Sequence, residues 1–157
     1  MKITRNFRLY EFFFSQTAID NGIDNTTEDE EVIYSIKRLC TKLLQPLRDQ
    51  LNTNITINSG YRCKELNELV GGVATSQHCL GKAADIVARG VSPIMVAKAV
   101  LDAKLPFDQM IVYPTFVHVS LRYSNRKQFL YNKSYKGKRL DAKYVKIRID
   151  DISSIVP

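Results

Sequence analysis

Apolar side chains recur at helical spacing over one long stretch in the first third of the chain. Residues 25–27 (Asn-Thr-Thr) can cap a helix, and the acidic residues 28–31 suit the positive end of its dipole. Apolar residues then follow every three or four positions: Val32, Ile33, Ile36, Leu39, Leu43, Leu44, Leu47 and Leu51. This pattern predicts one amphipathic helix over residues 28–51, with Pro46 as the point where it kinks or ends early.

The remaining chain carries shorter signals. Alternating or β-branched runs predict strands over residues 54–59, 83–88, 107–113, 115–121 and 127–131. Short helices are predicted over residues 64–70, closed by two glycines, and 92–103, opened by a Ser-Pro pair. Helices early and strands late favour an α+β fold in which an antiparallel sheet packs against helices.

The length of 157 residues fits a single domain with its own core. Residues 1–25 show no clear periodicity, so we expect an irregular N-terminal arm whose apolar side chains pack on the domain. Residues 122–157 form a basic tail. No repeat, low-complexity segment or linker divides the chain.

Charge is distributed unevenly along the sequence. The net charge is +7, and residues 122–157 contain ten Lys or Arg and three Asp, so this tail accounts for all of it. Such a tail can contact an acidic cell wall, an anionic membrane or nucleic acid, or it can be a solvated face. Tyrosines interleaved with the basic residues would suit single-stranded nucleic acid, which is the least favoured of these partners.

Cysteine usage and the N-terminus bear on the compartment. Cys40, Cys63 and Cys79 are an odd number without regular spacing, which does not indicate a disulfide framework. The N-terminal residues lack the long apolar run and small-residue cleavage site of a signal peptide. No segment has the roughly 18 apolar residues of a membrane span. We therefore expect cytoplasmic synthesis, with another factor delivering the protein to any target outside.

The chain has two histidines, and both can be placed beside a carboxylate. His78 precedes a glycine turn at Gly81, Asp85 follows in a predicted strand, and His118 lies in another predicted strand. Catalytic zinc takes three protein ligands and leaves a fourth position open. A lone histidine on a strand is also a common structural residue, so spacing alone leaves both interpretations open.

The neighbours of the histidines refine this picture. Strand alternation puts His118 on one face and Val117 and Val119 on the other, so His118 can point into a site while the valines fill the core. Cys79 could serve as a ligand or reactive thiol. Because adjacent side chains point apart and His78 already fills the ligand role, a packing role for Cys79 is favoured.

Several short motifs follow one another in a defined order. They are Asn6-Phe7-x-Leu9-x-Glu11-Phe12, Ser59-Gly60-Tyr61-Arg62, Leu66-Asn67 with Val70-Gly71-Gly72, Ser76-x-His78-x-x-Gly81-x-Ala83-x-Asp85, Phe107-Asp108-Gln109 and Val117-His118-Val119-Ser120. This order resembles the zinc D-alanyl-D-alanine carboxypeptidase family, whose members cut peptide stems of bacterial peptidoglycan and include many phage endolysins. The resemblance covers most of the chain, and the Ser-x-His-x-x-Gly-x-Ala-x-Asp motif is its most specific part.

The resemblance implies roles for individual residues. His78, Asp85 and His118 match the ligands of one Zn²⁺ per chain. Arg62 matches an arginine that contacts substrate and stabilises developing negative charge. Ser76 matches a substrate-binding serine, although it could equally cap the turn before His78.

One departure from the family pattern concerns the general base. Related proteins carry a glutamate shortly before the last histidine, whereas no acid lies between Gln109 and His118, and Tyr113 stands near that place. Three interpretations follow: Asp108 or another carboxylate is the base, Tyr113 supplies a hydroxyl, or the site binds zinc but cuts poorly. A tyrosine with a pKa of about 10 is a weak base but can stabilise an oxyanion. Gln109 is assigned to substrate contact.

The implied fold is that of the hedgehog and D-Ala-D-Ala peptidases. The implied activity is zinc-dependent hydrolysis of amide bonds in peptidoglycan stem peptides, at a bond involving D-alanine, by carboxypeptidase or endopeptidase action. A phage or prophage endolysin, released to the cell wall by a partner such as a holin, fits this interpretation. The alternative is a weak or inactive zinc-binding relative that binds cell wall or a protein partner. We expect a monomer.

Overall fold

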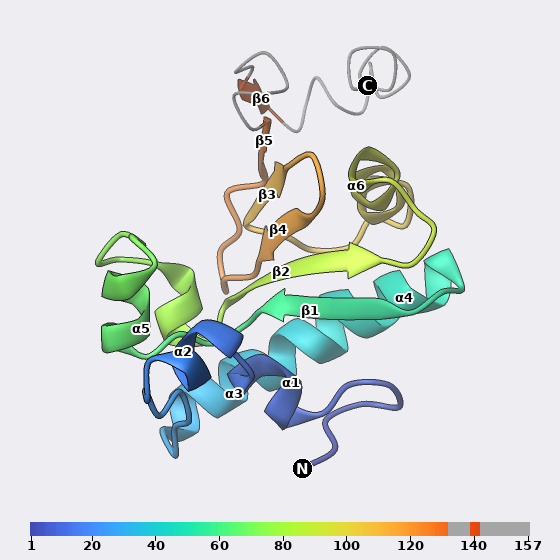
Figure 1. The fold of residues 1–157 in the computed structure, drawn as a ribbon. Helices are drawn as coiled ribbons and strands as arrows, with labels where there is room; N and C mark the ends of the chain where they lie inside the picture. Colours follow the sequence, from blue (N-terminus) through green and yellow to red (C-terminus); the bar gives the residue numbers. More distant parts are fainter. Residues whose placement is uncertain (132–138, 142–157) are drawn as a thin grey trace.

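The computed structural model describes residues 1–131 and 139–141, which form one mixed sheet with helices packed on it (Figure 1). The strands are β1 (Ile55–Ser59), β2 (Ala83–Ala88), β3 (Gln109–Val112), β4 (Val117–Ser120), β5 (Gln128–Tyr131) and β6 (Arg139–Asp141). Their order in the sheet is β1-β2-β4-β3-β5-β6. The helices are α1 (Leu9–Phe13), α2 (Gln16–Asp20), α3 (Glu30–Leu39), η1 (Cys40–Leu44), α4 (Gln45–Leu51), α5 (Lys64–Leu69), η2 (Gln77–Leu80) and α6 (Pro93–Asp102).

The predicted α+β class is confirmed, with one difference in the sheet. Neighbouring strands are antiparallel except β3 and β5, which run parallel. The chain leaving β4 passes the end of β3 before it enters β5, so β5 runs in the same direction as β3. The expectation of a purely antiparallel sheet is therefore wrong at this one pair.

The long predicted helix is present, but it contains a wider turn. It begins at Glu30, where the Asp29 carboxylate caps the backbone N–H groups of Glu31 and Val32. A π-helical turn, η1, then separates α3 from α4. Pro46 has no N–H and its ring crowds the carbonyl four residues earlier, so the wider turn lets the helix continue instead of ending.

The core lies between the sheet and the helices α3, α4 and α6. Alternate strand residues face these helices and are fully buried, among them Ala84, Ile86, Met110, Val112, Val117 and Val119. The predicted alternation is thus confirmed for Val117 and Val119. The residues between them, including Asp85 and His118, face the other side of the sheet.

The N-terminal arm differs from its prediction, because residues 1–25 contain the helices α1 and α2. The Glu11 carboxylate accepts from the Arg8 backbone N–H at 2.6 Å, and the Ser15 hydroxyl caps α2 by accepting from Ala18. The arm packs on the domain as expected, since Phe7 and Phe12 are buried in the core.

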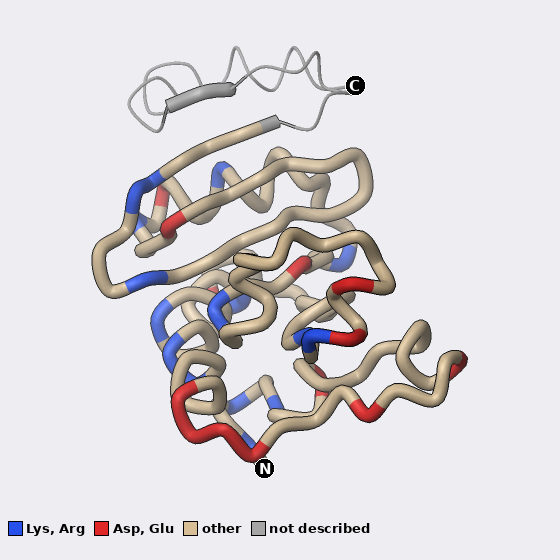
Figure 2. The backbone as a smooth tube through the Cα atoms, turned by 90° about the vertical axis from the view of Figure 1, so that its left-hand side faces the viewer, with Lys and Arg blue, Asp and Glu red and all other residues tan. Residues whose placement is uncertain are grey.

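Acidic residues gather at the N-terminal end of α3. Figure 2 shows the acidic residues at the start of α3 as a continuous run. Among the described residues, no helix combines the length and apolar character that crossing a bilayer requires. Most of the predicted basic tail, residues 132–138 and 142–157, lies outside the described residues.

Candidate metal centre

Asp85 is the central residue of the candidate site. It lies on β2 directly opposite His118 on β4, and this register brings their side chains together. The His118 Nδ1 atom is 2.9 Å from the Asp85 Oδ1 atom, and the His78 Nε2 atom is 3.4 Å from the same oxygen. The three predicted ligands, separated by up to 40 positions in sequence, therefore meet at one point.

His78 reaches this point from the short helix η2. The Ser76 hydroxyl caps η2 by accepting from the His78 backbone N–H at 3.3 Å. The His78 Nδ1 atom lies 2.7 Å from the Gly60 carbonyl oxygen, which can only accept, so Nδ1 carries the proton and donates. Its Nε2 atom faces Asp85, and a ring whose other nitrogen donates to a backbone carbonyl is typical of metal-binding histidines.

Two glycines permit this geometry. Gly81 ends η2 with a φ of +69°, and a Cβ there would lie 2.6 Å from the Val32 carbonyl oxygen. A Cβ on Gly60 would lie 2.7 Å from the Phe12 Cα. Only glycine fits these close backbone approaches.

The arrangement fits a metal ion such as zinc. One donor atom from each of His78, Asp85 and His118 lies within 4.8 Å of the other two. Tetrahedral zinc with bonds of about 2.0 to 2.1 Å needs ligand atoms about 3.3 Å apart. The two distances to Asp85 bracket this value, and two nitrogens with one carboxylate oxygen are donors that zinc accepts.

The Asp85 carboxyl is held in its ionised form. Burial by itself raises its pKa, but the contacts with His118 and His78 outweigh burial and bring the pKa below its ordinary value. The Arg62 guanidinium adds a cation 3.6 Å from the Asp85 Oδ2 atom. Asp85 is therefore available as an anionic ligand at neutral pH.

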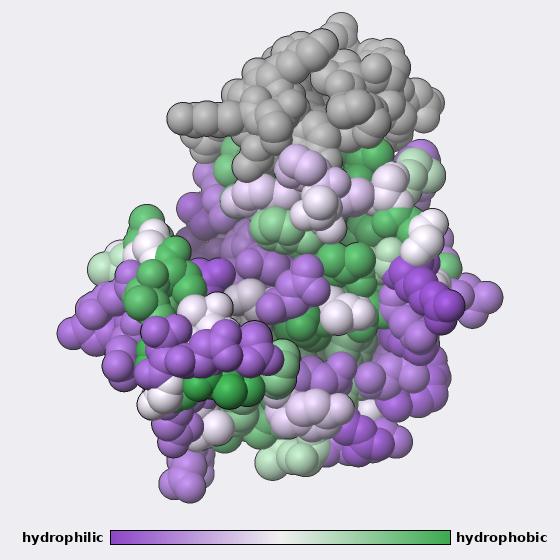
Figure 3. Space-filling view, in the orientation of Figure 1, coloured by the Kyte–Doolittle hydropathy of each residue, from purple (hydrophilic) through white to green (hydrophobic). Residues whose placement is uncertain are grey.

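The three residues line one wall of a cavity of about 710 Å³. Figure 3 shows this region as a hollow between the lobe that carries α5 and the strands of the sheet. Several residues predicted to contact substrate also line it: Arg62, Ser76, Gln109 and Tyr113. The Arg62 Nε atom donates to the Ser59 hydroxyl at 3.2 Å, which holds the guanidinium beside Asp85.

A family model described as Peptidase M15 matches residues 5–120. The chain belongs to the peptidase M15 family. The matched range contains His78, Asp85, His118 and Arg62, and the family is zinc-dependent. A comparison with curated proteins finds no match.

Tyr113 occupies the rim of this M15 site. Its ring stacks on Phe116 with a centroid distance of 4.4 Å, and its backbone N–H closes the β3–β4 hairpin. Burial raises the pKa of the Tyr113 hydroxyl, the negative charge of Asp85 raises it further, and Arg62 partly offsets both. The phenol therefore stays protonated at neutral pH and can donate a hydrogen bond.

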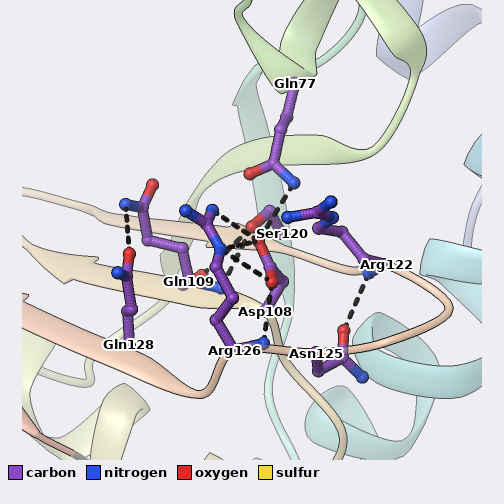
Figure 4. Close-up of polar contacts among 8 residues, drawn as sticks. All are labelled: Gln77, Asp108, Gln109, Ser120, Arg122, Asn125, Arg126 and Gln128. Atoms are coloured by element: carbon purple, nitrogen blue, oxygen red, sulfur yellow. Dashed lines mark hydrogen bonds and ion pairs between the residues drawn. The ribbon is translucent and has the colours of Figure 1, made fainter.

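Asp108 is placed differently from the three candidate metal ligands. Its side chain is fully buried and lies outside the cavity lining. Its two oxygens accept from the backbone N–H and guanidinium of Arg126 and from the Gln77 side chain (Figure 4). Burial raises the pKa of this carboxyl, but the hydrogen bonds from Arg126 and Gln77 outweigh burial and lower it. This placement does not favour Asp108 as a general base.

Sequence reasoning missed several residues of this M15 cavity. Lys82, Arg122 and Arg126 line it, and the Gly60 carbonyl orients His78. Arg122 and Arg126 were counted only as part of a basic tail. The signal that could have separated them is their position, within eight residues of His118 and directly after a strand.

Proposed function

We propose that this protein is a zinc peptidase that hydrolyses amide bonds in peptidoglycan stem peptides, at a bond involving D-alanine. The observation that carries the proposal is the meeting of His78, Asp85 and His118 at the wall of a peptide-sized cavity, in a chain of the peptidase M15 family. The D-alanine bond is proposed because the ordered motifs resemble those of the zinc D-alanyl-D-alanine carboxypeptidases.

The metal would be held by His78, Asp85 and His118. Zinc in such a site supplies Lewis-acid chemistry and lowers the pKa of water. His78 is pre-oriented for this task, because its other ring nitrogen is already bonded to Gly60. The ionised Asp85 balances part of the metal charge.

Around these ligands, the chain offers groups that act on the substrate. Arg62 is held by Ser59 with its guanidinium at the cavity, where it stabilises negative charge as it develops on the carbonyl oxygen. The protonated Tyr113 hydroxyl donates a second hydrogen bond to the same oxygen. Ser76 and Gln109 orient the peptide backbone.

The described part of the site lacks a carboxylate placed to act as general base. Among the described residues that line the cavity, Asp85 is the only carboxylate. Proton transfer by a positioned side chain contributes about 10²- to 10⁴-fold to the rate. We therefore expect slower turnover than in relatives that carry the glutamate.

The same observation favours a second candidate, a zinc-containing module that binds stem peptides without cutting them. Its cavity and metal ligands would be identical, and only turnover would be lost. Under either proposal the protein works as a monomer on the bacterial cell wall. A phage or prophage endolysin, made in the cytoplasm and released later, is the setting that we propose.

The deciding experiment measures bound zinc and amide release from purified peptidoglycan, for the wild type and for His78→Ala. About one zinc per chain, with cleavage lost in His78→Ala, supports the peptidase. Zinc without cleavage supports the binding module, and cleavage that persists after chelation contradicts both. Tyr113→Phe should keep zinc and lose about tenfold in kcat, since one hydrogen bond to the oxyanion is removed.

A further inference from the structure

The lining of the cavity carries more positive than negative charge. Four cations line it (Arg62, Lys82, Arg122 and Arg126), against one carboxylate, Asp85, among the described residues. Arg62 pairs with Asp85, and Arg126 pairs with Asp108 behind the cavity wall, so the charge imbalance lies in Lys82 and Arg122. A cavity with this lining attracts an anionic group.

Arg126 is fixed in place by a buried carboxylate. Its Nη2 atom lies 2.7 Å from the Asp108 Oδ2 atom, and its Nε atom lies 3.1 Å from Oδ1. Asp108 is fully buried, whereas the Arg126 side chain is 45% exposed and borders the cavity. Two of the five guanidinium N–H groups face Asp108, which leaves the remaining donors for a ligand.

Arg122 lies on the same loop and borders the same cavity. Its backbone N–H donates to the Asn125 side chain at 2.8 Å, which shapes the loop between β4 and β5. Figure 4 shows the side chains of Arg122 and Arg126 on the side of the loop that faces Gln77, with Asp108 and Ser120 between their guanidinium groups. No ion pair of Arg122 or Lys82 is found within residues 1–130.

The loop is close to the metal ligands but separate from them. Ser120, which bonds the Gln109 backbone N–H, lies two residues after His118 on β4. Arg122 follows His118 by four positions, which span about 13 Å in an extended strand, so Arg122 begins within about four peptide residues of the ligands. An extended peptide bound at the metal centre would therefore reach it.

We propose that Arg122 and Arg126 form a subsite for a carboxylate group carried by the peptide substrate, within about four residues of the bond that is cut. Planar guanidinium groups match carboxylates with two parallel hydrogen bonds. Asp108 and Gln77 hold Arg126 in position before the ligand arrives, which lowers the entropy cost of binding. The identity of the ligand as a peptide rests on the proposed function, and the preference for a carboxylate rests on the cavity itself.

A matched pair of peptides tests this subsite. The two share one D-alanine-containing sequence and differ only in a side-chain carboxylate, Glu in one and Gln in the other, two residues from the scissile bond. For the zinc-loaded wild type, the acidic peptide should have a KM at least about tenfold lower, with kcat nearly equal, because the contact is the same in ground and transition states. Arg122→Gln should remove most of this preference and leave the Gln peptide within about twofold.

Arg5→Gln is the matched control, since Arg5 is an exposed arginine that pairs with Asp49 on the helical side of the domain. It should leave both peptides unchanged. Arg126→Gln leaves the buried Asp108 carboxylate without its ion-pair partner and can destabilise the fold, so the thermal unfolding of this variant is measured as well. Arg126→Lys is a second variant, which keeps the positive charge. Arg126→Lys should keep the fold and weaken the preference, because an ammonium cannot form two parallel bonds.

The outcomes separate this inference from the proposed function. Cleavage of both peptides with equal KM values overturns the subsite and leaves the peptidase intact. If neither peptide is cut, the peptidase is wrong, and calorimetric titration of the same pair decides the subsite. Tighter binding of the acidic peptide, lost in Arg122→Gln, then supports it, and equal binding overturns it.

Discussion

Two aspartates with lowered pKa values, Asp85 and Asp108, lie in different surroundings and have different roles. Asp85 contacts two histidines and one arginine at the cavity wall. Asp108 lies at the start of β3, fully enclosed by Arg126 and Gln77. Hydrogen bonds and nearby positive charge lower the pKa of both below the ordinary value.

The difference lies in the partners. Both histidines contact one oxygen of Asp85 and can bind the same cation, and Arg62 approaches only the other oxygen, at 3.6 Å. The partner of Asp108 is a permanently charged guanidinium, which already satisfies the carboxylate. A low pKa therefore does not distinguish a metal ligand from a structural ion pair; the identity and exposure of the partners do.

The largest difference should appear in metal affinity. Asp85→Asn removes an anionic ligand, so zinc affinity should fall by more than about 100-fold, beyond the effect of losing an outer-shell partner. Asp108→Asn should change it by less than about threefold. Competition with a chromophoric chelator measures both, and similar losses in the two variants would contradict the assignment of Asp85 as a ligand.

The turn that brings His78 to Asp85 should be the next most sensitive feature. Gly81→Ala combines a φ of +69° with a Cβ 2.6 Å from a backbone oxygen, so we expect a loss of about 3 kcal/mol in unfolding free energy. Gly71→Ala is the control, because Gly71 has a φ of +74° but open space around it. It should lose only about 1 kcal/mol. Urea unfolding measures the loss of unfolding free energy in both variants. Equal losses would contradict the prediction, because they would mean that the backbone around Gly81 shifts to accommodate the Cβ.

Asp108 itself should matter for stability. Asp108→Asn leaves the amide group facing the Arg126 donors, so the unfolding free energy should fall by about 2 kcal/mol; the value is moderate because Arg126 is partly exposed. Asp102→Asn removes an exposed helix pair with Lys98 and should cost less than about 0.5 kcal/mol. Chemical denaturation of both variants measures these losses. An unchanged unfolding free energy in Asp108→Asn would show that the ion pair between Asp108 and Arg126 does not contribute to stability.

The smallest effect concerns pH. Because the folded pKa of Asp108 is lowered, its stabilisation is complete above its unfolded pKa of about 4 and is lost as pH falls through the folded value. The gap in unfolding free energy between wild type and Asp108→Asn should therefore narrow below about pH 4. Asp85 is present in both the wild type and Asp108→Asn, so its titration cancels in the difference. Chelator removes any bound metal, and the remaining pH dependence of the difference is that of Asp108. If the difference in unfolding free energy between wild type and Asp108→Asn grew as the pH fell, this prediction would be wrong.

The sequence predicted more of the metal site than of its surroundings. Spacing and strand alternation identified His78, Asp85 and His118 as candidates, and the structure brings the three together. The same reasoning placed Asp108 among possible bases, because a sequence does not reveal that Arg126, 18 positions later, encloses it. The cationic subsite was overlooked for the same reason.

By itself, the sequence determined the α+β class, the long helix and most strands, since hydrophobic periodicity and capping are properties of neighbouring residues. It also determined the family, through motifs that keep their order along the chain. Only the tertiary structure decided which His78 nitrogen faces Asp85, because the Gly60 carbonyl lies 18 positions away. It likewise decided that β5 runs parallel to β3, and that Asp85 faces a cavity while Asp108 faces an arginine. These outcomes depend on contacts between distant segments, which local patterns do not specify.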